Sequence, residues 1–256
     1  MAGTGPALRV TGKDPDYPEA LMRTLALHIS NGIVDGPTSL AFLLFALAAG
    51  AWCVHRARRD LDDRLVPLAG LVAAFVFAVQ MLNFPVLPGV SGHLFGGALA
   101  AALVGPWIGA LCVSVVLVVQ ALVFADGGVT AIGLNVTNMA LLHTAVAYGV
   151  LVLAARLLPR TPGAVAAAAG VAAWLATVVA SQGFVLQYWL GGAAPLPGGG
   201  LGALAATMGG LHALIGVGEG LITAVTVAAV ARSRPDLVYA LRGRPLPVRT
   251  SVGSPA

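Results

Sequence analysis

The sequence predicts an all-α, polytopic membrane protein with about seven transmembrane helices. Of its 256 residues, 58% are hydrophobic and only 9% are charged, whereas a soluble domain carries about 25% charged residues. The apolar residues form runs close to the ~20 residues that a helix needs to cross a bilayer. The positive charges, in contrast, gather in a few of the segments between those runs.

Seven apolar segments follow one another along the chain. The third is short and ends at Gly105-Pro106, so we expect a tilted or interrupted helix there, of the kind that is tolerated where the backbone is buried in protein or lines a cavity. The others are long enough, or nearly so, to span a bilayer. The segments comprise residues 37–55, 65–82, 93–104, 107–124, 135–157, 164–190 and 208–231.

The distribution of arginines predicts the orientation of the chain. With seven spans, the loop after the first span, the loop after the fifth and the C-terminal tail share one side, and they hold eleven of the fourteen Lys and Arg residues. The connections on the other side, residues 84–92, 125–134 and 191–207, hold none. Because positive residues favour the cytoplasmic side, we expect the N-terminus outside and the C-terminus in the cytoplasm.

Three parts of the chain differ in composition. Residues 1–26 are polar and rich in Pro and Gly, without the apolar core of a signal peptide, and we expect them to be disordered or to reflect a misassigned start. Residues 27–232 form the predicted membrane domain, and residues 233–256 form a cytoplasmic tail rich in Pro and Arg. The cytoplasmic arginines account for the net charge of +4 without a nucleic-acid partner.

The chain lacks the residues for ATP hydrolysis through a P-loop. Such a loop needs Gly-Lys-Ser/Thr at the start of a helix, and the only lysine, Lys13, is followed by Asp14. The Gly-rich residues 196–202 are therefore interpreted as a flexible outer loop. Uphill transport by this chain would need energy from another subunit.

Two histidines lie beside the predicted spans on the outer side. His28 precedes the first span, and His93 ends a loop rich in Pro and Gly that begins at Asn83. Imidazole is a good ligand for nickel, cobalt, zinc and copper, so both histidines are candidate metal ligands; the alternative is a role in turns or packing. Asn83 and Ser91 in the same loop are candidates to support such a site.

Polar residues inside the spans form a second group of candidates. Glu219 is the only acidic residue well inside a span, where an unpaired carboxylate is costly. His212 lies seven residues earlier, near the same helix face. Glu219 is interpreted either as a functional residue or as a brace paired with His212, His143 or a helix-terminal amide. Asn135 and Asn138 are expected to bond between helices or to support a loop near the site.

Several longer motifs occur in a fixed order along the chain. They are Leu27-His-Ile-Ser-Asn-Gly-Ile-Val-Asp-Gly-Pro-Thr-Ser39, Asn83-Phe-Pro-Val-Leu-Pro-Gly-Val-Ser-Gly-His-Leu-Phe-Gly-Gly-Ala98, Gly105-Pro-Trp, Gln120-Ala-Leu-Val-Phe-Ala-Asp-Gly-Gly128, Gly133-Leu-Asn-Val-Thr-Asn-Met139 and His212-Ala-Leu-Ile-Gly-Val-Gly-Glu-Gly220. In this order they resemble the CbiM/NikM family, the substrate-binding membrane (S) components of energy-coupling-factor cobalt and nickel transporters. The resemblance covers residues 27–232.

The resemblance implies a seven-helix S component whose N-terminal segment folds into the bundle. In the family, the metal is bound by the free terminal amine, the next backbone nitrogen, the imidazole of that residue and a later histidine. His28 and His93 match the two histidines, and Leu27 would supply the amine only as a free N-terminal residue. Planar nitrogen coordination favours Ni(II), Cu(II) and low-spin Co(II). Affinity would fall at low pH because the ligands must be deprotonated.

Leu27 departs from the family pattern, in which a methionine initiator precedes the first histidine. Translation could begin at codon 27, since some leucine codons serve as bacterial start codons. Alternatively, the extension could be cleaved, or it could stay and the metal coordination could change. The first alternative is favoured because residues 1–26 show no targeting or folding pattern.

The implied function is capture of Co(II) or Ni(II) as transported substrate, in a bacterial plasma (inner) membrane, with no cofactor and no enzymatic activity. Cobalt, for cobalamin biosynthesis, is favoured over nickel. The implied partners are a membrane scaffold (T) subunit, cytoplasmic ATPase subunits, a small two-span accessory subunit and the lipid bilayer. Two alternatives are an S component for an organic vitamin, in which His93 would matter little, and an intramembrane metalloenzyme, although the sequence has no His-Glu-x-x-His motif.

Overall fold

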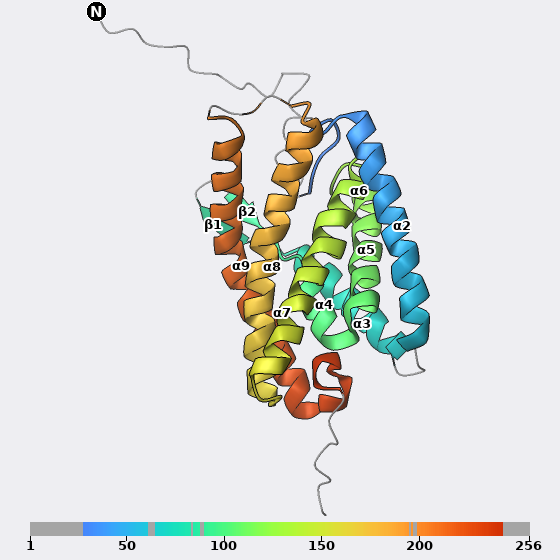
Figure 1. Cartoon of the computed structure of the whole chain (residues 1–256), viewed down its shortest axis with the longest axis vertical. Coiled ribbons are helices and arrows are strands. Elements are labelled where there is room, and N and C mark those ends of the chain that lie inside the picture. Colours follow the sequence, from blue (N-terminus) through green and yellow to red (C-terminus); the bar gives the residue numbers. More distant parts are fainter. Residues whose placement is uncertain are drawn as a thin grey trace, which may run out of the picture.

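Long helices packed side by side make up most of the molecule (Figure 1). This computed structural model describes residues 28–60, 65–82, 84–87, 90–194, 196 and 199–242. The predicted extension 1–26, Leu27, Asn83 and the part of the tail from residue 243 lie outside the described residues.

The helices follow the predicted apolar segments, and one short hairpin interrupts them. The first half of the chain forms α2 (Gly36–Asp60), α3 (Leu65–Gln80), β1 (Phe84–Leu87), β2 (Val90–Gly92), α4 (Gly97–Val104) and α5 (Pro106–Val123). The second half forms α6 (Ile132–Asn135), the π-helical η1 (Val136–Leu142), α7 (His143–Leu157), α8 (Pro162–Gly191), α9 (Gly200–Ser233) and the short 3-10 helices η2 (Pro235–Leu237) and η3 (Tyr239–Leu241).

Within the described residues, five helices are long and apolar enough to cross a membrane. They are α2, α5, the continuous run from α6 through η1 to α7, α8 and α9. The other two predicted spans become helices of 16 residues (α3) and 8 residues (α4), which are shorter than the ~20 residues of a complete span. The prediction of a helical, multi-pass membrane protein is therefore confirmed, whereas the number of seven spans and the orientation of the termini stay predictions.

The predicted break between the third and fourth segments is confirmed. Gly105 has a φ of +86°, which lies in the region that favours glycine. Pro106 occupies the first turn of α5, where its missing N–H would have no partner in any case. Beyond the break, α5 packs closely on α4, because a Cβ added at Gly109 would lie 2.9 Å from the carbonyl carbon of Ala100.

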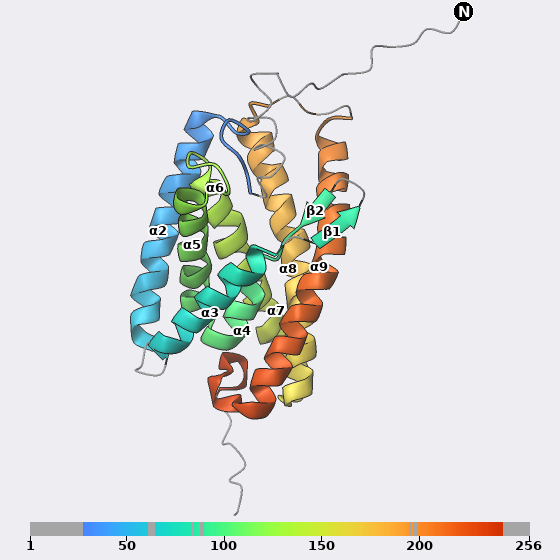
Figure 2. The ribbon, with the colours of Figure 1, turned by 180° about the vertical axis from the view of Figure 1, so that it is seen from behind.

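The loop before α4 contains a short antiparallel hairpin, which the all-α prediction missed. Phe84 pairs with Gly92 and Pro85 with Ser91. Strands of four and three residues are too short for an alternation of apolar and polar residues to identify them in the sequence. Pro85 also argues against a strand on sequence grounds, although a proline is tolerated at the edge of a sheet. The hairpin lies beside α9, about halfway along its length (Figure 2).

The short helix α4 lies at the centre of the bundle. All eight of its residues are buried, and it contacts α3, α5, α7, α8 and α9. Its sequence, Gly-Ala-Leu-Ala-Ala-Ala-Leu-Val, is rich in the small residues that let helices approach closely in a membrane. Large apolar side chains on the outer helices, such as Leu47, Trp189 and Leu221, are instead exposed, as expected of residues that face lipid.

Positive charge gathers at one end of the bundle. The C-terminal ends of α2, α7 and α9 lie together (Figure 1), and their last turns carry arginines. At this end the guanidinium of Arg56 lies 5.8 Å from the ring centroid of Trp52 and 5.3 Å from that of Trp107. Tryptophans and arginines are typical of the membrane–water interface, so this arginine-rich end marks one boundary of the apolar layer.

Candidate metal site

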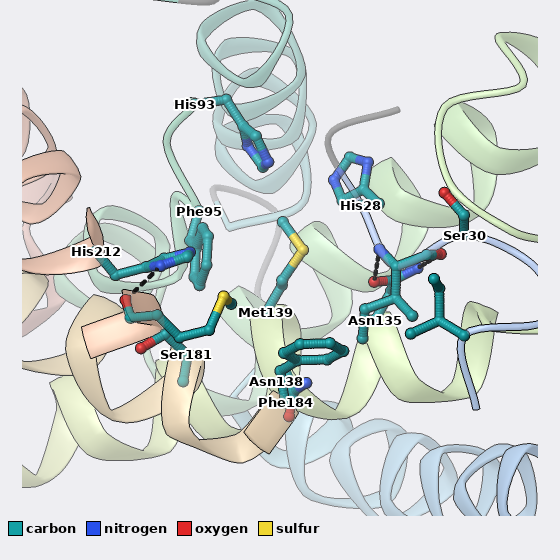
Figure 3. Close-up of a pocket in the computed structure, with 14 residues that line it drawn as sticks. His28, Ser30, His93, Phe95, Asn135, Asn138, Met139, Ser181, Phe184 and His212 are labelled. Atoms are coloured by element: carbon teal, nitrogen blue, oxygen red, sulfur yellow. Dashed lines mark hydrogen bonds between the residues drawn. The ribbon is translucent and has the colours of Figure 1, made fainter. Parts of the chain in front are cut away.

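A cavity of about 360 Å³ lies between the segment before α2, the residues after the hairpin, η1 and the helices α8 and α9 (Figure 3). Its wall combines imidazole, amide, hydroxyl and thioether groups with aromatic and aliphatic side chains. The residues that line it are His28, Ile29, Ser30, Ile33, His93, Phe95, Asn135, Asn138, Met139, Ala180, Ser181, Phe184, Met208 and His212.

The structure brings His28 and His93 together at this cavity, although 65 positions separate them in the sequence. Their ring centroids are 4.9 Å apart with a 55° angle between the ring planes, and both residues are buried. One nitrogen of each ring could lie about 2 Å from a shared ion at this separation, which is the usual length of a bond between a metal and an imidazole nitrogen. The pair thus has a geometry suited to two-point capture of a metal.

Asp126, in the loop after α5, contacts the ring of His28. Its Oδ1 atom lies 3.0 Å from Nδ1 of His28, a close polar contact without the alignment of a full hydrogen bond. A carboxylate at Nδ1 orients the ring and strengthens Nε2 as a ligand. Chelation by the backbone amide and the imidazole of one histidine uses Nδ1 instead, and an ion bound in that way would displace the carboxylate from Nδ1. The loop reaches this position because Gly127 has a φ of +97°, and an added Cβ there would lie 2.9 Å from Cβ of His28.

Asn135 holds the backbone next to His28. Its side-chain Oδ1 accepts a hydrogen bond from the amide of Ile29 at 3.0 Å, and its Nδ2 donates to the carbonyl of Ile29 at 3.1 Å (Figure 3). The amide of Gly128 donates to the same carbonyl at 2.9 Å. Asn31 extends this docking, because its Oδ1 accepts hydrogen bonds from the amide and hydroxyl of Thr130. The segment that carries His28 is therefore fixed to the loop after α5 and to the start of the long helix run.

His93 belongs to a short backbone segment, residues 93–96, in which both the amide and the carbonyl of Phe95 are hydrogen-bonded to side chains. Nδ1 of His93 lies 2.9 Å from the carbonyl oxygen of Leu94; a hydrogen bond donated there leaves Nε2 as the lone-pair nitrogen. The carbonyl of Phe95 accepts a hydrogen bond of 2.7 Å from Nε2 of Gln80. The Phe95 ring lies 5.9 Å from the His93 ring and 5.8 Å from the His212 ring, centroid to centroid.

Glu219 lies beneath this segment as the centre of a buried network. Its carboxylate accepts hydrogen bonds from the amides of Phe95 at 3.0 Å and Gly96 at 2.8 Å, and from the hydroxyl of Thr177 at 2.8 Å. Nε2 of His143 lies 3.3 Å from Oε1 of the carboxylate and 3.2 Å from the Thr177 hydroxyl. Of the two interpretations of Glu219 from the sequence, the contacts fit the brace, with His143 and helix-terminal amides as its partners.

The remaining polar candidates face the cavity from η1 and α9. Nδ2 of Asn138 donates a hydrogen bond of 2.7 Å to Gln187 on α8, which agrees with a role between helices. His212 lines the cavity, and its Nδ1 lies 2.8 Å from the carbonyl oxygen of Met208 (Figure 3). His212 therefore bonds to its own helix, although it shares a face with Glu219.

Three predicted residues do not appear among these contacts. Leu27 and Asn83 lie outside the described residues, and Ser91 is described only as part of β2. Among the residues that the structure describes, no group of three or more His, Cys, Asp or Glu side chains has the arrangement of a metal site.

Sequence reasoning missed several buried polar residues at and around the candidate site. Asp126 is the only acidic residue in the predicted outer connection 125–134, a property that could have identified it. Gln80, Thr177 and Gln187 are fully buried polar residues within apolar segments. The cost of an unpaired polar group in a bilayer applies to them as it does to Glu219, and would have predicted a bonding partner for each.

A family model matches most of the chain. It is described as CbiM, "Cobalt uptake substrate-specific transmembrane region", and it matches residues 28–237. The match includes both histidines of the cavity, Asp126, Asn135 and Glu219.

Three relatives show how far the similarity extends. A candidate fused nickel transport protein NikMN of Archaeoglobus fulgidus is 40% identical over 212 residues, covering 83% of this chain and 68% of the relative. The fused nickel transport protein NikMN of Rhodobacter capsulatus is 35% identical over 237 residues, covering 87% and 67%. The cobalt transport protein CbiM of Geobacter sulfurreducens is 34% identical over 222 residues, covering 83% and 62%.

Two crystal structures share the fold. A truncated transition metal transporter has a TM-score of 0.69 and 26% identity, covering 80% of this chain and 99% of its own. A second transition metal transporter has a TM-score of 0.72 and 24% identity, covering 84% of this chain and all of its own.

Proposed function

This chain belongs to the CbiM family of cobalt-uptake transmembrane proteins, and from that membership we propose that it captures Co(II) or Ni(II) and delivers the ion across the membrane. The chain is a component of a metal transporter and not an enzyme. Its relatives include proteins that carry nickel and proteins that carry cobalt, so the identity of the ion is part of the proposal.

One observation carries the assignment of the site, namely the pairing of His28 and His93 across 4.9 Å in a shared cavity. Both rings are buried, and Asp126 and Asn135 hold His28 and its neighbour in place. Two imidazoles held in advance near a common point lower the entropic cost of binding an ion between them.

The proposed coordination adds nitrogen donors from the N-terminal side of His28. A free amine on Leu27, the amide nitrogen of His28, its imidazole and the imidazole of His93 would make a planar set of four nitrogens. Such a set favours Ni(II), Cu(II) and low-spin Co(II) over Zn(II) and Mg(II). A chain that begins at residue 27 would provide this amine directly; a chain that keeps residues 1–26 would need a different fourth donor.

We propose that the protein works as the S component of an energy-coupling-factor transporter in the plasma membrane. Since it has no P-loop sequence, energy for uphill transport would come from cytoplasmic ATPase subunits through a membrane scaffold (T) subunit. A small two-span accessory subunit completes the proposed assembly. Delivery of cobalt for cobalamin biosynthesis is the role we favour, and relatives occur in both bacteria and archaea.

Native mass spectrometry of the natively expressed, detergent-purified protein tests this proposal. The spectra would compare wild type, His93→Ala and His55→Ala with Co(II) and with Ni(II). His55 is a matched control because it lies near the C-terminal end of α2, beside Arg59, and far along the helix from the cavity. We expect one ion on the wild type and on His55→Ala, and none on His93→Ala.

The same spectra report the start of the chain. A chain that begins at residue 27 and carries one ion supports the four-nitrogen site. A full-length chain whose ion still depends on His93 contradicts that coordination but keeps the capture function. An absence of ion on every variant, or an ion that ignores His93, overturns the proposal and favours a carrier of another substrate, such as an organic vitamin.

A further inference from the structure

A second cavity of about 360 Å³ lies at the arginine-rich end of the bundle, away from the histidine pair. It is bordered by the C-terminal half of α7, by Ala101 of α4 and by the η3 segment that follows α9. One wall is apolar and consists of Ala101, Leu151, Val152 and Ala155. The other part of the lining is polar and cationic, so the cavity joins two kinds of surface.

The polar part of the lining holds two guanidinium groups and two phenols, from Arg160, Arg242, Tyr148 and Tyr239. The Arg242 guanidinium lies 5.6 Å from the Tyr239 ring centroid, and the two tyrosine rings lie 6.4 Å apart. Burial and then the neighbouring Tyr148 raise the pKa of the Tyr239 phenol, so this phenol stays protonated. The carboxylate of Asp60 also raises the pKa of this phenol.

The cavity lies at the level of the membrane boundary. Tyr239 packs against the turn between α4 and α5, since a Cβ added at Gly105 would lie 2.8 Å from the Tyr239 ring. Trp107, two residues further on, contacts Arg56. Arginine, tryptophan and tyrosine concentrate where hydrocarbon meets water, so the polar part of the cavity meets the headgroup layer and the apolar wall meets the acyl chains.

We propose that this cavity binds the phosphate of an anionic phospholipid. Guanidinium groups match phosphate oxygens in a two-pronged geometry, and basic pockets between membrane helices are suited to anionic headgroups. The apolar wall of Ala101, Leu151, Val152 and Ala155 offers a surface for the start of an acyl chain. A free phosphate ion would use only the polar part of this lining.

Lipid titrations followed by native mass spectrometry of the full-length, detergent-purified protein test the proposal. The probes are a phosphatidylglycerol, a phosphatidylcholine with the same acyl chains, and inorganic phosphate. The variants are Arg160→Gln, Arg242→Gln and the double variant. Arg234→Gln is the matched control, because Arg234 lies at the same end but pairs with Asp236 at 2.8 Å outside the cavity.

We expect phosphatidylglycerol to bind more tightly than phosphatidylcholine, and each cavity variant to weaken it by about fivefold, while Arg234→Gln leaves it unchanged. Equal binding of the two lipids, or equal effects of all arginine variants, would overturn the site. Binding of inorganic phosphate that matches phosphatidylglycerol would overturn its assignment to lipid. Thermal unfolding without added lipid identifies any arginine variant that fails to fold. Tyr148→Phe, which keeps the ring and the charge, is then measured in place of that variant. Weaker phosphatidylglycerol binding by Tyr148→Phe supports the site, and unchanged binding opposes it.

Discussion

The carboxylate of Glu219 accepts a hydrogen bond of 2.8 Å from the backbone amide of Gly96, 123 positions away in the sequence. A second bond of 3.0 Å from the amide of Phe95 joins the same carboxylate. His93 lies only two residues before Phe95. The helix α9 therefore fixes the backbone from which His93 reaches the cavity, through a residue that does not itself line the cavity.

Replacement of Glu219 by Gln should weaken both the bundle and metal binding. A glutamine side chain of the same size offers one oxygen, so its NH2 group would face an amide that has lost its acceptor. An unsatisfied buried donor costs about 1–3 kcal/mol, and loss of a group that supports a metal ligand costs about 10–100-fold in affinity. Thermal unfolding in detergent and titration with Ni(II) measure the two effects.

Thr177→Val is the control for Glu219→Gln. It removes one hydrogen bond to the carboxylate and leaves both backbone amides paired. It should lower stability while metal affinity changes little. If the two variants lower metal affinity equally, the amides of Phe95 and Gly96 are not the route by which Glu219 supports the site.

Asp126→Asn should lower metal affinity without a comparable loss of stability. The change removes the negative charge 3.0 Å from Nδ1 of His28, which orients the ring and strengthens Nε2 as a ligand, and for an ion bound at Nε2 we expect a decrease of about 10–100-fold. Asp35→Asn is the matched control, since this carboxylate lies near the same end but bonds to Thr38. A rise in affinity would instead mean that the ion binds Nδ1, as the four-nitrogen set requires, and that the Asp126 carboxylate competes with it.

Asn135→Ala should release the segment that carries His28. The change removes two hydrogen bonds to the backbone of Ile29, each worth about 0.5–1.5 kcal/mol. We expect faster hydrogen exchange of residues 28–31 and weaker Ni(II) binding. Asn138→Ala is the matched control, because Asn138 lines the same cavity but bonds to Gln187 instead of Ile29. Hydrogen exchange of residues 28–31 should stay slow in this variant.

The start of α2 should depend on pH through Asp35. Its carboxylate accepts hydrogen bonds from the Thr38 hydroxyl and amide, which lower its pKa below the ordinary value of 3.8. Because the folded-state pKa lies below the unfolded one, this stabilisation is present above the unfolded value and disappears as pH falls through the folded value. The difference in thermal unfolding between wild type and Asp35→Ala should therefore shrink in acid. A difference that stays constant down to about pH 2 would contradict this role for the Asp35 carboxylate.

The sequence predicted the elements of the fold better than their contacts. Apolar runs located every long helix, and Gly105-Pro106 located the break, because both signals are local. The hairpin escaped prediction because each strand has too few residues to show alternation. The helices α3 and α4 are too short to cross a bilayer alone, and only their packing within the bundle makes them stable there.

In the candidate site, too, the sequence predicted the main residues better than their contacts. His28 and His93 were predicted as a pair from their loops, and the structure places them together. The partner of Glu219 could not be chosen from spacing, because His212 shares its helix face but bonds to the carbonyl of Met208. Asp126 was missed because its role depends on a loop folding beneath the N-terminal segment, a contact between positions that no local pattern links.

Because α4 is short, His93 lies at a depth in the bilayer where the membrane potential would act on a bound ion. Its eight residues rise about 12 Å from the level of Trp107, whereas the hydrocarbon layer is about 30 Å thick. The hairpin that leads to His93 accordingly lies about halfway along α9 (Figure 2). In the predicted orientation, a divalent ion that reaches His93 has already crossed part of the membrane potential. The full drop is worth about 2.3 kcal/mol per charge at 100 mV, so an inside-negative voltage would favour occupancy before any ATP is consumed.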